Sequence, residues 1–386
     1  MLSHHLITHL EPLQALESSW NELCQQDPNA TPFQSHAWLY TWCLANHEKP
    51  WIVLIYHAEK LVGILPFAYQ YKFFLHRLHL LGAPDADYLG FILHPAWETA
   101  ILDYFFQNLL PQQYPHIKLL TLSDLNERTP LPTYLLNHAL DPFRLLQHTN
   151  APCPYLELPP SWEEYLAQLS SAFRQSIRRK ERQLNKFFTV HMDHLTNINH
   201  TQSHLETFMN LHQASWVVRN RPGAFARLRF AHFHRLLAPR LWQEGALYLV
   251  QLQLNGQPVA AYYFLKQNKT LYYYLSGFDP QQAQYSPASV LLAMVIRSAI
   301  TQGITEVDLM RGTRRYKYHW TSKTRRNHSL TLGQQKSLAP LFFYLESHVK
   351  QTTLRCKEYI PTSWRHRIWK RLPTWFKNRV EGLFRN

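Results

Sequence analysis

Residues 303–320 read GITEVDLMRGTRRYKYHW, an apolar strand that runs directly into an Arg-Gly turn and then a basic, aromatic segment. Side chains such as Val307 and Leu309 suit a buried strand. Asp308 and Lys317, in contrast, are costly to bury unless they are paired or face a ligand. So many titratable groups at one strand end indicate the rim of a site for an anion. The alternative is an edge strand followed by a solvated basic loop.

Strand pairs with the same pattern occur before this segment, once in each half of the chain. Residues 50–69 and 245–264 each carry an apolar run, a short polar turn and a second apolar run, which predicts a hairpin. In the second hairpin Asn255 and Gly256 occupy the turn, where the backbone needs positive φ. The order of elements is duplicated, because each hairpin precedes a third apolar stretch ending in a loop with Gly and Pro, at 78–88 and 271–285.

Helical segments complete both halves. Residues 34–46 place Trp38 and Trp42 four positions apart, and residues 287–302 carry apolar side chains at helical spacing. We expect the two tryptophans to lie in a core rather than form a binding platform. Residues 150–160, NAPCPYLELPP, contain prolines that stop a helix and favour an extended linker.

The length and composition of the chain fit two ordinary domains. It has 386 residues, of which 46% are hydrophobic, so each half can bury a core. We therefore predict an α/β (α+β) protein with domains at 1–150 and 151–337, each built on a mixed, antiparallel-rich sheet. A short basic helical tail, residues 338–386, follows them.

The charge of the chain is strongly positive. It contains 40 Lys and Arg against 26 Asp and Glu, a net charge of +14, which indicates an anionic partner or substrate. Phosphates, nucleic acid and acidic lipid all remain open. The first residues do not combine a basic start with a long apolar run, and no stretch of about 18 uncharged apolar residues is present. We expect a cytoplasmic protein that does not span a membrane.

Cysteine and histidine give no metal motif. The histidine pairs His191 with His194 and His232 with His234 lack the helical spacing with an intervening Glu that zinc hydrolases use, so we predict no metal. The cysteines lie far apart without a C-x-x-C pair, which predicts reduced, structural thiols. They are Cys24, Cys43, Cys153 and Cys356.

The tail holds half of the surplus charge. Residues 351–386 contain nine Lys or Arg against two Glu, a net of +7, interleaved with Trp and Phe. Basic residues with aromatics suit an interfacial helix on an anionic bilayer, which predicts peripheral contact with the inner face of a membrane. The alternative is that the aromatics pack against the second domain while the basic face is solvated.

The chain resembles the GNAT-type acyltransferases of the CelD and FemAB-like family over roughly residues 15–335. The resemblance implies two tandem GNAT-like domains and transfer of an acyl group from acyl-CoA, such as acetyl-CoA, to an amine or hydroxyl. It departs from the family at Pro287, where Ala288 follows instead of Gly, and no pyrophosphate loop with spaced glycines is visible. The segments that carry it are SSAFRQSIRRKERQL (170–184), HQASWVVRNRPGAF (212–225), GQPVAAYYF (256–264), SGFDPQQAQYSPASVLL (276–292) and DLMRGTRRYKYHW (308–320).

The donor's pyrophosphate requires cationic or N–H groups. The helix start at Ser286, Ala288 and Ser289 is a plausible phosphate cradle, with Ser286 as its cap, or simply a well-made helix end. Arg174 and Arg178 belong to a cationic helix stripe, and because the resemblance also falls on them, we expect both at the site. The other cations of that stripe fit a solvated face.

Acyl transfer needs a deprotonated nucleophile, donors for the oxyanion and a proton for the departing thiolate. Asp308 can hold or deprotonate the nucleophile, and Tyr316 or His319 can pass a proton. Arg311, beside Gly312, and Lys317 can bind phosphate or acceptor charge. The alternative for Asp308 is a structural ion pair with Arg311 or Lys317. No local motif signals a covalent acyl-enzyme, which favours direct attack.

Two other functions stay open. One is a FemAB-like transferase that uses aminoacyl-tRNA, whose RNA donor would demand a broad basic channel. The other is a non-catalytic, membrane-associated accessory protein of polysaccharide or lipid assembly. The acceptor is expected to be a small molecule or a cell-envelope component, and nucleic acid is expected only as tRNA.

Overall fold

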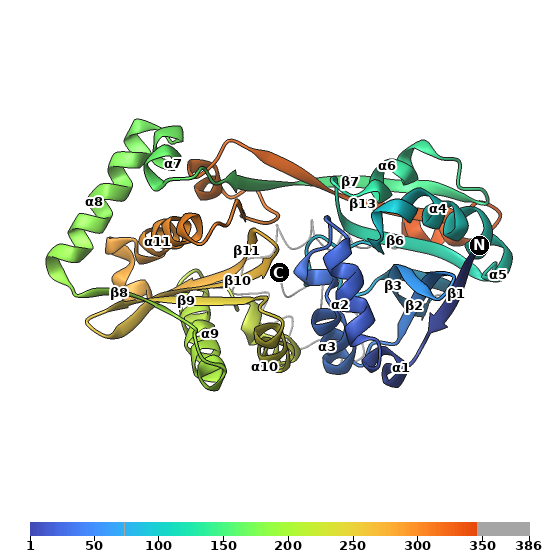
Figure 1. Cartoon of the computed structure of the whole chain (residues 1–386), viewed down its shortest axis with the longest axis horizontal. Coiled ribbons are helices and arrows are strands. Elements are labelled where there is room, and N and C mark those ends of the chain that lie inside the picture. Colours follow the sequence, from blue (N-terminus) through green and yellow to red (C-terminus); the bar gives the residue numbers. More distant parts are fainter. Residues whose placement is uncertain (73, 346–386) are drawn as a thin grey trace.

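The computed structural model describes residues 1–72 and 74–345 and divides them into two similar halves (Figure 1). The first half contains the strands β1 (Leu2–Ile7), β2 (Pro50–His57), β3 (Lys60–Lys72), β4 (Leu75–Leu80), β5 (Ile92–Leu93), β6 (Ile117–Asn126) and β7 (Phe143–Glu157). Its helices are α1 (Leu10–Gln14), α2 (Glu17–Gln26), α3 (His36–Asn46), α4 (Glu98–Asp103), α5 (Leu110–Gln113) and α6 (Pro130–Asn137).

The second half repeats this order. Its strands are β8 (Val190–His194), β9 (Leu247–Leu254), β10 (Gln257–Gln267), β11 (Thr270–Phe278), β12 (Glu306–Asp308) and β13 (Thr324–Gln334). Its helices are α7 (Trp162–Gln168), α8 (Ser171–Phe187), α9 (Thr201–Val217), α10 (Leu228–Gln243) and α11 (Pro287–Thr301), with short 3-10 turns at Pro280–Tyr285 and Arg315–His319.

The strands form one sheet whose order is symmetric about its centre: β1-β2-β3-β4-β6-β13-β7-β12-β11-β10-β9-β8. In each half, four strands pair antiparallel in chain order, and a fifth pairs parallel with the fourth. This arrangement confirms the predicted α/β fold class, two tandem domains with mixed, antiparallel-rich sheets.

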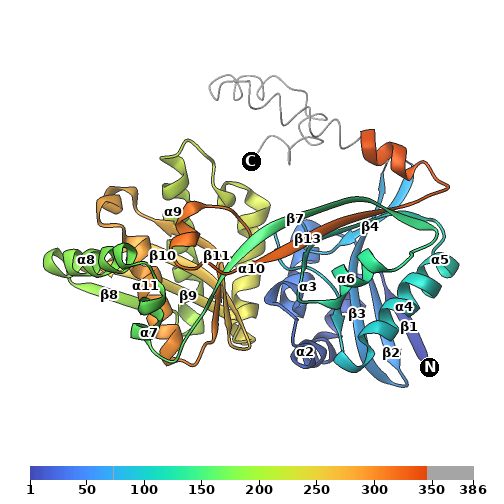
Figure 2. The same ribbon diagram turned by 90° about the horizontal axis from the view of Figure 1, so that it is seen from above.

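The two halves exchange their last strands. β7 follows the first half but pairs with β12 of the second, and β13 follows the second half but pairs with β6 of the first. β7 and β13 also pair with each other, and Figure 2 shows them as a long antiparallel ribbon that joins the halves. The expected boundary at residue 150 therefore falls inside a strand, and residues 324–334 belong to the sheet of the first half.

The predicted hairpins and helices are present. The β2–β3 and β9–β10 pairs are antiparallel hairpins, and Asn255 and Gly256 have φ of 51° and 79° as the tight turn requires. The expected linker is extended, but it is a paired strand rather than a free connection. Its prolines lack N–H groups, yet the carbonyls of Pro152 and Pro154 accept the N–H groups of Gly312 and Leu309.

The interface between the halves is an aromatic core. α3 and α10 face each other there (Figure 1), and the rings of Trp38 and Trp42 lie 5.2 and 5.3 Å from Phe233. Both tryptophans are buried, which confirms the expectation that they are core residues. Such edge-to-face pairs contribute about 0.5–1.5 kcal/mol each beyond the area that they bury.

His234 is fully buried in this interface, and neither of its ring nitrogens has a hydrogen-bond partner among the described residues. Burial lowers its pKa to about 3. Below about pH 6.5 the unfolded state takes up a proton that the folded state refuses, so each pH unit of acidification costs about 1.4 kcal/mol.

We expect His234→Phe to raise the free energy of unfolding by about 1–3 kcal/mol at pH 7, because a ring of similar shape replaces two unsatisfied polar atoms. The gain should grow at pH 5, where the wild-type protein carries the protonation penalty. Thermal melts at pH 5, 6 and 7 measure both effects. A less stable variant at every pH would show that the ring nitrogens make a favourable bond to water.

Among residues 1–72 and 74–345, no helix combines the length and the apolar character needed to cross a bilayer. Three of the cysteines, Cys24, Cys43 and Cys153, are buried free thiols, as predicted. Cys356 and the tail from residue 346 onward lie outside the described residues, and so does the predicted interfacial helix.

Candidate functional site

The parallel strands β11 and β12 separate at one end. They pair only from Thr270 to Tyr272 against Glu306 to Asp308, after which the chain turns away at Leu309. β11 continues to Phe278, and beyond Tyr272 its only strand partner among the described residues is β10. One edge of β11 thus offers backbone groups to a ligand, as an unpaired strand edge does. This opening is called the splay below.

The equivalent place in the first half is closed by its own chain. β4 ends at Leu80, and residues 82–90 return so that Leu89 forms a parallel bridge with Leu125 of β6. The parallel pair β4–β6 is therefore extended by a local loop. Of the two equivalent places, the one in the second half is therefore open to a ligand.

A line of tyrosines crosses the splay. The Tyr316 hydroxyl, from the turn after β12, donates to the Tyr273 hydroxyl at 3.3 Å, and Tyr273 donates to the Ser276 Oγ at 2.6 Å. The neighbouring Tyr262 donates to the Ala288 carbonyl at 2.9 Å. The rings of Tyr262 and Tyr273 lie 4.9 Å apart, so packed tyrosines connect the turn that carries Tyr316 to the start of α11. Burial raises the pKa of Tyr316, so the hydroxyl keeps its proton at neutral pH.

The start of α11 has free polar groups. Ser286 precedes the helix with a left-handed φ of 53°, and its side chain makes no capping bond, so the cap expected from the sequence is absent. Its carbonyl instead accepts the N–H groups of Ser289 and Val290. Pro287 has no N–H, and the N–H of Ala288 has no partner among the described residues. The predicted Ser286, Ala288 and Ser289 therefore stand at a helix N-terminus that can receive an anion.

Two arginines that the sequence reasoning missed lie at the same end of β11. The guanidinium groups of Arg219 and Arg314 lie 5.8 and 5.6 Å from the ring of Trp216, and Arg219 is also 5.6 Å from Phe278. No carboxylate in the described part of the chain pairs with either side chain. Exposed arginines held against rings without an acid partner remain available for a phosphate. In the sequence, only the spacing of Trp216 and Arg219, three positions apart as on one face of a helix, could have indicated that these side chains lie together.

The predicted Arg174 and Arg178 differ in their positions. The start of α8 packs on the turn after β12, where Phe173 stacks on His319 at 5.3 Å and meets Trp320 at 5.0 Å. Arg174 follows Phe173 and donates to the Leu166 carbonyl at 3.4 Å. Arg178 lies a turn further along and forms an exposed ion pair with Glu163 at 2.8 Å.

Asp308 lies in a buried network. Its Oδ2 accepts a hydrogen bond from the Tyr88 hydroxyl at 2.7 Å and lies 3.3 Å from Arg325, while its Oδ1 accepts the Met310 N–H at 2.7 Å. Burial raises its pKa to about 6, so it is ionised at neutral pH. This is the structural ion pair considered from the sequence, with Arg325 as the partner in place of Arg311 or Lys317.

Arg311 and Lys317 also hold the junction. Arg311 binds Asp124 at 2.6 Å and Asp87 at 3.3 Å, both from the first half. The buried ammonium of Lys317 donates to the carbonyls of Met310 and Arg311 at 3.0 and 2.9 Å, and burial lowers its pKa. The turn these bonds fix contains Met310 and Gly312 at φ of 62° and 133°. Strained residues persist where the surroundings over-determine them.

The loop at 82–90 supplies several of the side chains that bind charged groups of the second half. Asp85 accepts two hydrogen bonds from Arg227 at 2.7 and 3.0 Å, Asp87 binds Arg311, and Tyr88 binds Asp308. The loop therefore anchors the first half to the second half directly beside the turn that carries Tyr316.

His212, on α9, holds the open part of β11 in place through a hydrogen bond to its backbone. Its Nδ1 donates to the Ser276 carbonyl at 2.8 Å, and its Nε2 accepts the Ala224 N–H at 3.3 Å. Burial lowers its pKa to about 4, so the ring is neutral at pH 7. β11 and α9 approach so closely that a Cβ at Gly277 would collide with the backbone of Leu211 and His212.

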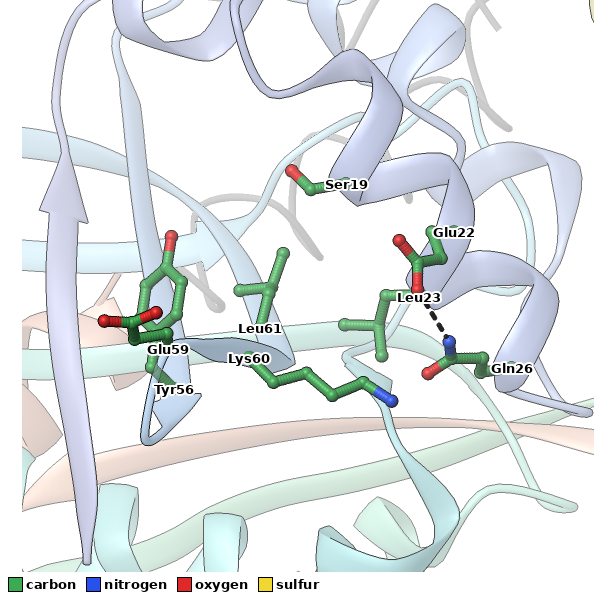
Figure 3. Close-up of a pocket in the computed structure, with 8 residues that line it drawn as sticks. All are labelled: Ser19, Glu22, Leu23, Gln26, Tyr56, Glu59, Lys60 and Leu61. Carbon is green, nitrogen blue, oxygen red and sulfur yellow. Dashed lines mark hydrogen bonds between the residues drawn. The ribbon is translucent and has the colours of Figure 1, made fainter.

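A surface hollow elsewhere carries no comparable set of groups. Figure 3 shows it between α2 and the β2–β3 hairpin, with a volume of about 220 Å³. Glu22, Glu59 and Lys60 line it, and Glu22 accepts a hydrogen bond from Gln26 at 3.1 Å. None of the residues that form the splay lines this hollow.

Residues 171–318 match the family model described as an acetyltransferase (GNAT) domain. This part of the chain is therefore similar to a GNAT-type domain. No curated protein matches the chain. The matched residues include the splay and every predicted site residue except His319, which directly follows the matched range. The assignment to the CelD type stays a prediction.

Solved structures with the same fold cover most of this chain. FemX has a TM-score of 0.60 at 9% identity, covering 85% of this chain and 96% of its own. The C-terminal domain of a putative lysylphosphatidylglycerol synthetase from Agrobacterium fabrum has a TM-score of 0.52 at 9% identity, covering 86% and 95%. A protein of unknown function from Bacteroides thetaiotaomicron has 0.52 at 11%, covering 86% and 99%. At these identities the likeness shows the fold alone.

Proposed function

We propose that this protein is an N-acyltransferase that moves an acyl group from acyl-CoA to an amine, or to a hydroxyl, by direct attack. The splay in the GNAT-type domain carries this proposal. Within the described part of the chain, it combines a strand edge without a strand partner, two arginines without acid partners and a helix start with an unbonded N–H.

The groups around the splay fit such a donor. An extended chain that bears amides can hydrogen-bond to the open edge of β11. Phosphates suit Arg219, Arg314 and the free N–H of Ala288, because charge-assisted bonds and a helix N-terminus both favour anions. Arg174 stands beside the same turn. When bound, the thioester supplies the activated acyl carbon.

Within the turn after β12, we assign the proton-transfer role to Tyr316. The Tyr316 hydroxyl carries a proton at neutral pH that it can donate to a departing thiolate, and His319 is a further titratable group on this rim. We assign Asp308, Arg311 and Lys317 to positioning, because their charged groups are already bonded within the junction. A cysteine nucleophile is disfavoured, because burial raises the pKa of Cys153 to about 12.

A second candidate is an aminoacyl-tRNA-dependent transferase. The net charge of +14 favours it, since an RNA donor requires an extended basic surface. The two donors differ in the size of the charged surface that they need. Mutations at the splay alone would weaken acyl-CoA binding strongly but the binding of a tRNA only slightly.

The direct test is thermal stabilisation of the full chain by acetyl-CoA, longer acyl-CoAs and free CoA, followed by thiol release with a panel of amines. A ligand at 100 times its dissociation constant adds about 2.7 kcal/mol. We expect a saturable shift with acyl-CoA and CoA, and thiol release with at least one amine. If aminoacyl-tRNA alone raised the melting temperature, the donor would be aminoacyl-tRNA and not acyl-CoA. If no ligand raised the melting temperature and no thiol were released, the result would favour a non-catalytic accessory protein.

A further inference from the structure

The end of the described chain carries an apolar surface. Residues 339–345 are helical, and residues 338–345 read LAPLFFYL, without a charged side chain. One face of this helix packs on the first half, where Ala339 joins Leu75 and Leu119 in a small core. The opposite face is also apolar, and Leu341 is 55% exposed. A helix that is apolar all round is typical of a segment buried on every side.

The tip of the β3–β4 hairpin extends this surface. Leu75, at the tip, shares the small core with Phe342 and Phe343, so the hairpin and the helix are neighbours (Figure 2). Beside it, Phe74 is 84% exposed. Exposed apolar side chains that cluster in this way mark an interaction surface. We call this set the apolar patch; its members are Tyr71, Phe74, Leu338, Leu341, Tyr344 and Leu345.

The charge around the patch is mainly positive, and Glu346 is the first acidic residue that follows it in the sequence. Residues 69–79, YQYKFFLHRLH, and 335–345, QKSLAPLFFYL, contain Lys and Arg but no Asp or Glu. The chain continues from the patch into 351–386, where nine Lys or Arg stand against two Glu. A protein partner with an acidic surface would match the charge but not the aromatic and aliphatic side chains, whereas an anionic bilayer matches both.

We infer that the apolar patch is a docking surface for an anionic lipid bilayer. Phe74 and Leu341 enter the interface between headgroups and acyl chains, and the exposed Lys336, close to Leu338, attracts the anionic headgroups. The surface is built by the first half and the end of the second, so it does not depend on the acyl-donor assignment.

Co-sedimentation of the full chain with vesicles tests this inference. The probes are phosphatidylcholine vesicles with and without 30% phosphatidylglycerol, at low and moderate salt. We expect binding to the anionic vesicles that weakens with salt, and a bound fraction at least ten-fold lower for Phe74→Asp combined with Leu341→Asp. Leu228→Asp is the matched control, because Leu228 is 85% exposed at the start of α10 and lies outside the patch.

Unchanged thermal melts would show that the double variant is folded, and Phe74→Ser with Leu341→Ser repeats the test without added negative charge. Equal vesicle binding by wild type and both double variants would overturn the inference, since the basic segment alone would then bind. An absence of wild-type binding would overturn it as well. So would concentration-dependent self-association that the variants abolish, because a second copy would then cover the patch.

Discussion

Replacing Arg325 with Met is expected to lower the free energy of unfolding by about 3–5 kcal/mol, because it leaves two buried carboxylates without their shared cation. The Arg325 side chain is 3% exposed, lies 2.7 Å from Glu306 and 3.3 Å from Asp308, and stacks 3.9 Å from the centre of the Tyr155 ring. These contacts connect β12, β13 and β7 where the two halves exchange strands. Denaturant unfolding monitored by tryptophan fluorescence measures the loss.

Arg128→Met is the matched control for this prediction. Arg128 also pairs with Glu306, at 3.1 Å, but its side chain is 47% exposed, so its removal should cost less than about 1 kcal/mol. Adding Asp308→Asn to Arg325→Met should restore part of the loss, because it removes one unpaired charge. Equal costs for Arg325→Met and Arg128→Met would contradict a buried network at the junction.

The pH dependence gives a second readout of the same network. A carboxyl whose folded pKa is raised binds a proton in the folded state before the unfolded state does, so its contribution to stability falls as pH rises towards the folded pKa. The pKa of Asp308 is raised to about 6 in the wild type, and loss of Arg325 should raise it further. The deficit of Arg325→Met should therefore be smaller at pH 5 than at pH 8.

Removing Arg219 and Arg314 together is expected to lower kcat/KM for the acyl donor by roughly 10²–10⁴-fold. Each charge-assisted bond to a phosphate contributes about 1.5–3 kcal/mol. The effect should fall mainly on KM, because both cations hold the donor and neither touches the reacting carbon. Folding should be little affected, since no carboxylate among residues 1–72 and 74–345 loses a partner when either arginine becomes alanine.

Arg235→Ala is the control for the loss of an exposed arginine outside the site. Arg235 is a comparably exposed arginine on α10 that pairs with Glu206 at 2.7 Å, away from the splay. Initial rates of thiol release at varied acyl-CoA concentration separate KM from kcat. If the double variant had an unchanged KM for acyl-CoA, the donor site could not lie at the end of β11.

The sequence predicted the parts of the fold that depend on neighbouring residues. Hairpins follow from the alternation of apolar and polar residues, and the Asn255-Gly256 turn follows from the need for positive φ. The repeated order of these local elements was enough to predict a duplicated α/β chain. It did not predict the exchange of β7 and β13, because pairing between strands far apart in the sequence leaves no local pattern.

The geometry of the candidate site could be predicted only in part, because contacts between residues far apart in the sequence leave no local pattern. The segment after β12 was singled out because it combines an apolar strand with charged residues, and the structure indeed brings Tyr316 against Tyr273 there. The partner of Asp308 could not be predicted, because Arg325 reaches it from another strand. Arg219 and Arg314 meet only through Trp216, a contact that depends on how α9 packs against the turn after β12.

Hydrogen exchange with and without acetyl-CoA tests the central claim, that the splay of the second half binds the donor. We predict slower exchange in peptides that cover Tyr273 to Phe278 and Ser286 to Leu292, with no change at Pro50 to His57 or Leu75 to Leu80 in the first half. Protection confined to the first half, or absent throughout at saturating acetyl-CoA, would contradict the account.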